Sequence, residues 1–227
     1  MIRKRDVLKS SIDIKANRPP ADLSIEQYLM TSESLVAQVI ALESVFRDKK
    51  ILHLGDDDHL SVLFAHYLNC QPYVAEYDER IRKSLQNMYH EYNVNNSDVI
   101  PYDARELLPS GVTADAFYIN PPYSSKNNGK GAKVWISRAS QAVPVGSTSI
   151  LVYPIDETLP WTLSCFSEII DFAYQQGFVV TNIDRDLHTY EYLPKDPGLL
   201  SSNIYLYKFK ESKPIEVEDI HDESLYR

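Results

Sequence analysis

Cysteines and long hydrophobic runs are scarce in this chain. Only two cysteines, Cys70 and Cys165, occur among the 227 residues. Both lie in apolar stretches with helical spacing, so we expect buried free thiols and not a disulfide or a metal-binding pair. No apolar run approaches the length that crosses a bilayer. No apolar segment follows the basic start Met1–Arg5, as it would in a secretory signal. We therefore expect a cytoplasmic protein with no membrane partner.

Positive charge is also scarce. The chain has 23 lysines and arginines against 32 acidic residues, which gives a formal net charge of −9. Proteins that hold nucleic acids over a wide surface neutralise phosphates with basic side chains, so a nucleic-acid partner is not expected. A cationic small molecule suits this charge better.

Glycines number only seven, and no glycine-rich phosphate loop is present. The segment Gly55-Asp56-Asp57-Asp58 occupies the place where a nucleotide-binding chain usually carries its glycines. It follows an apolar strand at 50–54 and precedes a helical run from Ser61 to Leu68. A glycine-rich turn offers backbone N–H groups to an anion, whereas three carboxylates repel an anion and attract a cation. This acidic turn predicts an amine on the cofactor or on the substrate.

Strands and helices alternate along the rest of the chain. Alternation at this spacing indicates crossover units, a mainly parallel sheet and helices on both faces. The predicted fold is therefore α/β and Rossmann-like, of the methyltransferase type, with 203–209 as an antiparallel edge strand. Strands are expected at 50–54, 72–77, 98–102, 115–119, 148–153, 178–184 and 203–209, and helices at 60–69, 79–92, 131–142 and 161–176.

Three regions are expected along the chain. Residues 1–23 are largely polar and include Arg18-Pro19-Pro20, which predicts a loosely held arm. Residues 24–210 are expected to form one catalytic domain, beginning with a helix over 24–46 that Ser24 caps. Residues 211–227 are polar and acidic and predict a tail.

Acidic residues also end the next two predicted strands. Glu76 lies 21 residues after Gly55, a separation at which a carboxylate can accept hydrogen bonds from ribose hydroxyls. The alternative is a cap for the following helix, and Asp78 suits that role better than Glu76 does. Asp103 could bind the exocyclic amine of an adenine, or it could equally cap a short helical run.

The segment Asn120-Pro121-Pro122-Tyr123 ends the fourth predicted strand. The prolines fix the backbone, so the carbonyls beside them point outward as acceptors. Together with the Asn120 side chain they can hold an amine N–H, while Tyr123 offers an aromatic face to a base or a cation. This pattern indicates transfer of a group to an amino nitrogen. The loop that follows, 124–133, carries Lys126, Lys130 and Lys133 and is expected to be a solvated loop or a lid.

The ordered set of motifs resembles the branched-chain polyamine synthases, also called bis(aminopropyl)spermidine synthases. The resemblance covers residues 18–209, the catalytic domain of that family. We do not expect here the amino-terminal winged-helix-like domain of the archaeal members. The family's usual Asp-Gln and Asp-Pro-Pro-Tyr read Glu26-Gln27 and Asn120–Tyr123 in this chain. The matching residues are Arg18-Pro19, Gln27, Thr31, Leu54–Asp58, Glu76–Arg80, Asn120–Tyr123, Ser137-Arg138, Gly177-Phe178, Asp184–Asp186 and Tyr190.

The resemblance implies aminopropyl transfer from decarboxylated S-adenosylmethionine to a polyamine, without a metal and in a homodimer. The segment 24–46 is a possible contact between subunits. An aspartate of the acidic turn would take the proton of the attacking amine, while Asn120 and the Pro121 carbonyl orient that amine. The expected catalytic residues are Asp57, Asp58, Asn120, Pro121 and Tyr123, and the expected cofactor-binding residues are Gln27, Gly55, Asp56, Glu76, Asp78 and Asp103.

Two alternatives stay open at this point. The first is a methyltransferase that uses ordinary S-adenosylmethionine and acts on an amino nitrogen through Asn120–Tyr123. The second is a polyamine-binding relative without catalytic activity. The acidic turn favours aminopropyl transfer, because the ordinary donor would bring a carboxylate against three aspartates.

Overall fold

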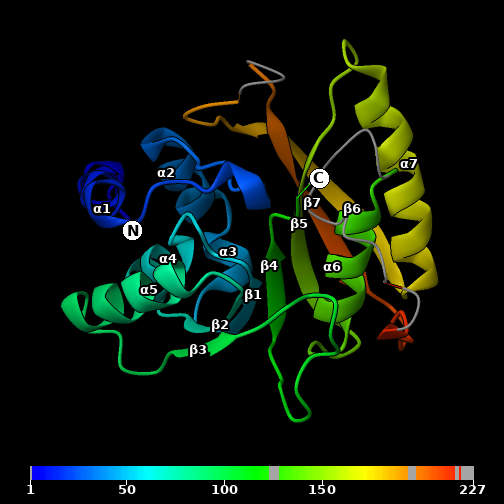
Figure 1. The fold of residues 1–227 in the computed structure, drawn as a ribbon, viewed down its shortest axis with the longest axis horizontal. Helices are drawn as coiled ribbons and strands as arrows, with labels where there is room; N and C mark the ends of the chain where they lie inside the picture. Colours follow the sequence, from blue (N-terminus) through cyan, green and yellow to red (C-terminus); the bar gives the residue numbers. More distant parts are fainter. Residues whose placement is uncertain (1, 123–127, 194–197, 218–219, 221–227) are drawn as a thin grey trace.

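A computed structural model describes residues 2–122, 128–193, 198–217 and 220. Seven strands of these residues form one twisted sheet in the order β3-β2-β1-β4-β5-β7-β6 (Figure 1). The elements are α1 (Lys4–Asn17), the 3-10 turn η1 (Leu23–Ile25), α2 (Ser32–Ala41), α3 (Glu43–Phe46), β1 (Lys50–Leu54), α4 (Leu60–Leu68), β2 (Gln71–Glu76), α5 (Glu79–Glu91), β3 (Asp98–Pro101), β4 (Ala116–Ile119), α6 (Lys130–Ser140), β5 (Thr148–Pro154), α7 (Pro160–Gln175), β6 (Phe178–His188) and β7 (Ser201–Lys208).

The two faces of the sheet are covered by different helices. Side chains alternate along each strand, so Ile51 of β1 packs with α2 and α4 while Leu52 and Leu54 pack with α6. In Figure 1, α1 to α5 lie on one side of the sheet and α6 and α7 on the other. The strands are therefore buried on both faces, as in other sheets built from crossover units.

The predicted α/β fold is confirmed, and each expected strand agrees with an observed one to within a few residues. Strands β1 to β5 are parallel to one another, and β7 is antiparallel to both β5 and β6. The antiparallel strand takes the place next to the edge, and β6 forms the edge itself. The carboxyl ends of β1, β2 and β4 meet at one edge of the sheet, where ligands bind in such folds.

The amino-terminal region differs from the expected loose arm. Residues 4–17 form helix α1, whose Val7 and Ile14 are fully buried. The spacing of seven residues places both side chains on one helix face, which packs on α2 and α4. The polar residues on the other face conceal this pattern in the sequence.

The single helix expected over 24–46 is replaced by three shorter elements. Thr31, not Ser24, caps α2, with its hydroxyl accepting the Ser34 N–H. Residues between η1 and α2 run extended past the strand end at 188–191, where Met30 and Tyr190 form an antiparallel bridge. Helix α2 exposes only Glu33 and Ile40 to any great extent, so it offers little surface for the contact between subunits that we considered.

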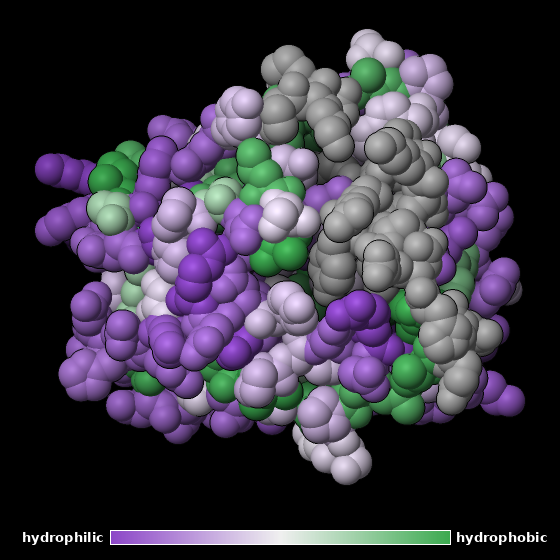
Figure 2. Space-filling model, in the orientation of Figure 1, coloured by the Kyte–Doolittle hydropathy of each residue, from purple (hydrophilic) through white to green (hydrophobic). Residues whose placement is uncertain are grey.

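Both cysteines are buried free thiols, as expected, although Cys70 lies just after α4 and not within it. Among the described residues, no helix combines the length and the apolar character that a bilayer crossing requires. In Figure 2, hydrophilic side chains cover most of the surface over α1, α4 and α5, and hydrophobic ones form small groups between them.

A buried glycine between α7 and β6 gives a direct test of this packing. Gly177 has φ +84°, and a Cβ there would lie 2.3 Å from the Lys210 carbonyl oxygen. We expect Gly177→Ala to lower the free energy of unfolding by about 2–4 kcal/mol, because backbone strain and overpacking add. Urea unfolding measures the loss. Gly146→Ala is the matched control, since Gly146 also has positive φ (+94°) but no atom within 4 Å of the added Cβ. Equal losses in the two variants would contradict the clash.

Candidate active site

A cleft opens at the carboxyl ends of β1, β2 and β4. Its empty space is about 950 Å³, a figure that includes open solvent at the mouth of the cleft. Gln27, the whole acidic turn, Glu76, and the motif residues Asn120 and Pro121 all line it. The expected site residues are thus largely brought together, although they come from four separate parts of the chain.

The Asp56 carboxylate forms hydrogen bonds that stabilise the local fold. Its carboxylate accepts hydrogen bonds from the backbone N–H of Leu60 (2.9 Å) and Ser61 (3.3 Å) and from the Ser61 hydroxyl. These bonds satisfy donors in the first turn of α4, as a helix cap does. Gly55, which begins the turn with φ +71°, donates its N–H to the Ala75 carbonyl. Burial, opposed by the Ser61 hydrogen bonds, raises the pKa of Asp56 well above its usual value.

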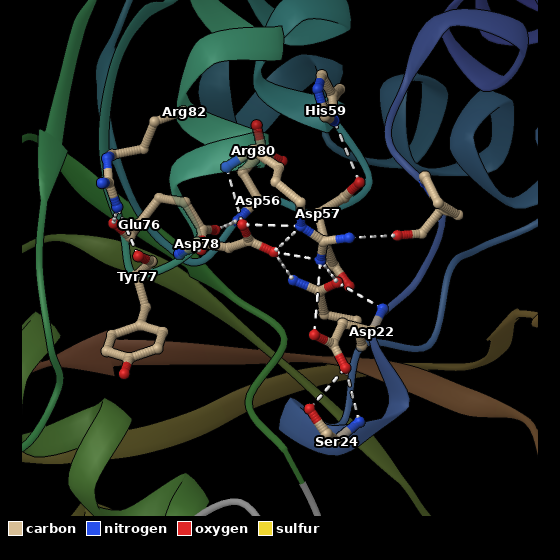
Figure 3. Close-up of polar contacts among 12 residues, drawn as sticks. Asp22, Ser24, Asp56, Asp57, His59, Glu76, Tyr77, Asp78, Arg80 and Arg82 are labelled. Carbon is tan, nitrogen blue, oxygen red and sulfur yellow. Dashed lines mark hydrogen bonds and ion pairs between the residues drawn. The ribbon is translucent and has the colours of Figure 1, made fainter.

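Asp57 has a different environment. It is partly exposed in the cleft, and within the described part of the chain no hydrogen bond reaches its carboxylate. Its carbonyl accepts a bond from Nδ1 of His59 (3.1 Å), while Nε2 of that ring lies 2.9 Å from the Ser84 hydroxyl (Figure 3). Burial, then the charges of Asp58, Glu76 and Asp56, raise the pKa of Asp57 well above its usual value. This carboxylate is therefore available to a ligand and has an increased affinity for a proton.

Asp58 is held by an ion pair. Its Oδ1 lies 3.1 Å from Nη1 of Arg18 and accepts the Met30 N–H at 2.7 Å. Burial raises the pKa of Asp58 to about 6, although Arg18 opposes the rise. The three aspartates of the turn thus differ in role: one caps a helix, one pairs with an arginine, and Asp57 faces the cleft.

Glu76 supports the turn from the neighbouring strand. Its Oε2 accepts the Asp56 N–H (2.9 Å) and its Oε1 accepts the Asp78 N–H (2.7 Å). Each carboxylate oxygen can accept a second bond, so Glu76 can still bind ribose hydroxyls from the cleft. Burial raises the pKa of Glu76, although the two backbone hydrogen bonds oppose this.

Asp78 lies in a polar cluster beside the cleft, together with Arg80 and Asp22 (Figure 3). Asp78 caps α5, accepts bonds from the Arg80 guanidinium, and is not among the residues that line the cleft. Its role as a helix cap is confirmed, and its direct binding to a cofactor stays a prediction. Gln27 lines the cleft and donates Nε2 to Asp78 at 3.2 Å, so it connects the cleft wall to this cap.

Asp103 lies just outside the cleft. Its carboxylate accepts the Arg105 N–H at 2.9 Å and pairs with the Arg105 side chain, closing a turn where we expected a short helix. Burial works against ionisation, but the bonds from Arg105 hold the pKa of Asp103 below its usual value. Tyr102 and Ala104, on either side of it, line the cleft in its place.

Asn120 presents an unsatisfied acceptor to the cleft. Its Oδ1 is buried and has no hydrogen-bond partner among the described residues. A buried amide oxygen without a partner costs about 1–3 kcal/mol, so a donor supplied by a ligand would be bound favourably here. Pro121 and Pro122 line the cleft beside it. Tyr123 and Lys126 lie outside the described residues.

The sequence did not single out several aromatic residues of the cleft. Trp135 of α6 lines it and donates Nε1 to the Leu54 carbonyl at 3.3 Å. Tyr118 of β4, two residues before Asn120, lines the cleft close enough to the acidic turn for the aspartate charges to act on it. Tyr28 adds to the wall, as does Tyr190, which the sequence already places among the residues of the family resemblance. A search one helical turn into α6 could have identified Trp135, but the others depend on long-range packing.

The fold and the cleft define a methyltransferase-type protein of the Rossmann-like class. A putative RNA methyltransferase from Pyrococcus horikoshii has a similar structure, with a TM-score of 0.68, 18% identity, and coverage of 92% of this chain and 100% of that one. At this level of identity the likeness concerns the fold alone.

The chain belongs to the branched-chain polyamine synthase family, since residues 6–214 match the family model of the branched-chain polyamine synthase A C-terminal domain. The branched-chain polyamine synthase from Thermus thermophilus, solved with N4-aminopropylspermidine and 5′-methylthioadenosine, has a TM-score of 0.81. It is 20% identical, with 97% of this chain and 68% of that one covered.

Two curated relatives match over part of their length. The N(4)-bis(aminopropyl)spermidine synthases of Thermococcus kodakarensis and Methanocaldococcus jannaschii are 30% and 29% identical over 122 and 124 residues. In each case the match covers 52% of this chain and 35% of the relative. This chain therefore matches about a third of the length of these relatives.

The crowded carboxylates of the turn should make stability depend on pH. An unfolded aspartate releases its proton near pH 3.9, whereas folded Asp57 keeps its proton to higher pH. Between these two pKa values the folded state binds more protons, so folding weakens as pH rises. We expect Asp57→Asn to stabilise the protein by about 1 kcal/mol or more at pH 8 and by much less at pH 4.5. Chemical unfolding at both pH values measures the difference.

Asp103→Asn is the control, and we expect it to change the stability in the opposite direction. The pKa of Asp103 is lowered in the folded state, so its stabilisation is present above its unfolded pKa and is lost as pH falls through the folded pKa. This variant should therefore weaken folding at neutral pH. Stabilisation by both substitutions would argue against a local effect at the turn.

Proposed function

We propose that this protein transfers an aminopropyl group from decarboxylated S-adenosylmethionine to an amine nitrogen of a polyamine. The observation that carries the proposal is the carboxylate of Asp57, which lines the cleft with no hydrogen-bond partner among the described residues. An ammonium is the complement of this group. The family membership and the product named in the Thermus thermophilus complex support the same reaction.

The residues present fit both substrates. Glu76, at the end of β2, would bind the ribose of the donor, and Gln27 closes the wall beside it. The unsatisfied Oδ1 of Asn120 would accept an N–H of the attacking amine. The carbonyl of Pro121 would help to aim that amine at the donor. The cleft thus offers a carboxylate for the sugar on one side and acceptors for an amine on the other.

The proposed transfer is an in-line displacement. The neutral amine nitrogen attacks the carbon beside the sulfonium, a C–N bond forms, and the C–S bond breaks with its electron pair left on sulfur. 5′-Methylthioadenosine leaves, and the proton lost by the amine passes to Asp57 directly or through one water. The sulfonium is already a good leaving group, so this chemistry needs no metal. Within the described residues, no cluster of His, Cys, Asp or Glu has a geometry that would hold one.

Incubation with decarboxylated S-adenosylmethionine and spermidine should yield products heavier by one or more aminopropyl groups, with 5′-methylthioadenosine released. Asp57→Asn should lower kcat by about 10²–10³-fold, because the proton acceptor is lost while the side-chain shape is kept. Mass spectrometry of the polyamines measures the products. Glu168→Gln removes an exposed carboxylate that pairs with Lys133 and should leave the rate unchanged. If no polyamine gains an aminopropyl group but one gains a methyl group from S-adenosylmethionine, the chain is a methyltransferase.

Donor binding gives a second, independent test. Ordinary S-adenosylmethionine places a carboxylate near the acidic turn, and each 1.4 kcal/mol of repulsion weakens binding about tenfold. We expect calorimetry to show at least tenfold tighter binding of the decarboxylated donor. Asp57→Asn should reduce this preference, since one of the repelling charges is removed. Tighter binding of ordinary S-adenosylmethionine would favour methyl transfer.

A homodimer and a cytoplasmic location, both expected from the sequence, stay predictions. If the protein binds both donors and polyamines cleanly but turns neither over, it is a polyamine-binding relative of these enzymes.

A further inference from the structure

A buried arginine connects the acidic turn to two other segments of the chain. Arg18 follows α1, and only 2% of its side chain is exposed. Its Nη1 donates to Asp58 Oδ1 at 3.1 Å, and its Nη2 contacts Glu191 Oε1 at 2.8 Å and the Met30 carbonyl at 3.1 Å. One guanidinium thus joins the turn after β1, the segment before α2 and the segment after β6.

The partners of Arg18 form or adjoin two walls of the cleft. Met30 lines the cleft, and its N–H donates to Asp58 at 2.7 Å. Met30 also pairs with Tyr190, which lines the cleft as well, and the Glu191 N–H donates to the Leu29 carbonyl at 2.9 Å. Asp58 is therefore held at the junction of these segments through its Oδ1, which accepts both the Arg18 and the Met30 hydrogen bonds.

Arg18 is also the cation that faces the acidic turn. Asp58 pairs with Arg18 and directly follows Asp57 in the chain. The arginine favours the ionised form of Asp58, and that charge in turn opposes ionisation of Asp57. The other groups that face these two aspartates are Asp56 in the turn, Glu76 at the end of β2, the Tyr118 hydroxyl on β4, the neutral His59 ring at the start of α4, and Glu191, which Lys15 pairs.

We propose that Arg18 and Asp58 form a positioning pair that tunes Asp57 as the proton acceptor of the transfer reaction, an inference that rests on the proposed function. Arg18 keeps Asp58 charged and fixed, and the charge of Asp58 makes Asp57 a stronger base than an isolated aspartate. A general base works best when its pKa approaches the working pH, so a fixed negative neighbour assists the removal of an amine proton. Asp58 itself takes no proton from the substrate.

The test is the titration of Asp57 in the wild type and in Asp58→Asn. Carboxyl carbon NMR follows the ionisation, and Asp57→Asn assigns the signal. Asp58→Asn removes a negative charge beside Asp57 and leaves the positive charge of Arg18 in place. Both effects favour the ionised form of Asp57. We expect the midpoint to fall by about one pH unit, and the acidic limb of kcat/KM to move with it. A purely structural pair would lower activity at every pH without moving either midpoint.

Two further variants separate charge from geometry. Arg18→Lys keeps the positive charge but lacks the planar fork that spans three partners, so it should leave the midpoint of Asp57 nearly unchanged while raising KM for the polyamine severalfold. Arg18→Met with Asp58→Asn removes both buried charges together, which avoids an unpaired carboxylate and keeps the fold testable. Glu43→Gln, which breaks an exposed pair with Arg47, is the control and should change neither readout.

The outcomes distinguish this inference from the proposed function. An unchanged or raised midpoint of Asp57 in Asp58→Asn would overturn the tuning role. Loss of transfer at every pH in Asp58→Asn, with the Asp57 titration unmoved, would also overturn it, whether the pair is purely structural or Asp58 itself accepts the proton. Because the NMR titration requires no substrate, a wild type that transfers no aminopropyl group would defeat the proposed function while leaving the tuning measurable.

Discussion

The repulsion among carboxylates in the turn after β1 is the constraint on which the site depends. Asp56, Asp57, Asp58 and Glu76 lie close enough that their charges act on one another, and burial adds to the cost of ionising them. The fold holds this arrangement by giving two of the aspartates strong partners. Asp56 receives the first N–H groups of α4, and Asp58 receives Arg18. The free energy of these bonds offsets the repulsion and keeps the third carboxylate in the cleft.

The sheet supplies the framework for this arrangement. Parallel strands β1, β2 and β4 end together, so short turns after each bring the acidic turn, Glu76 and Asn120 to one edge. The same edge binds anionic phosphates in nucleotide-binding relatives of the fold through helix N-termini. Here the N-terminus of α4 is already occupied by Asp56. A carboxylate thus takes the place where a phosphate would bind, which supports the proposed preference for an ammonium.

Sequence reasoning succeeded where the signal is local. Alternation of strands and helices identified the sheet, and the candidate residues Gly55, Glu76 and Asn120, predicted at strand ends, line one cleft there. It did not find α1 as a packed helix, because its apolar face is only a few residues wide. It also could not assign distinct roles to three adjacent aspartates. Those roles depend on Ser61, in the first turn of the following helix, and on Arg18, which reaches the turn through tertiary packing and leaves no mark in the local pattern.

The different roles of the three aspartates explain why Asp57, which faces the cleft, lies beside two aspartates that form hydrogen bonds within the fold. An isolated aspartate in an open cleft would have a pKa near 3.9 and would be a weak base toward an amine. Burial alone would raise that value but would also favour a neutral side chain, which attracts no ammonium. Fixed negative neighbours raise the proton affinity of Asp57 while keeping the cleft attractive to cations. The same charges disfavour the carboxylate of ordinary S-adenosylmethionine, so the turn that strengthens the base would also select the donor.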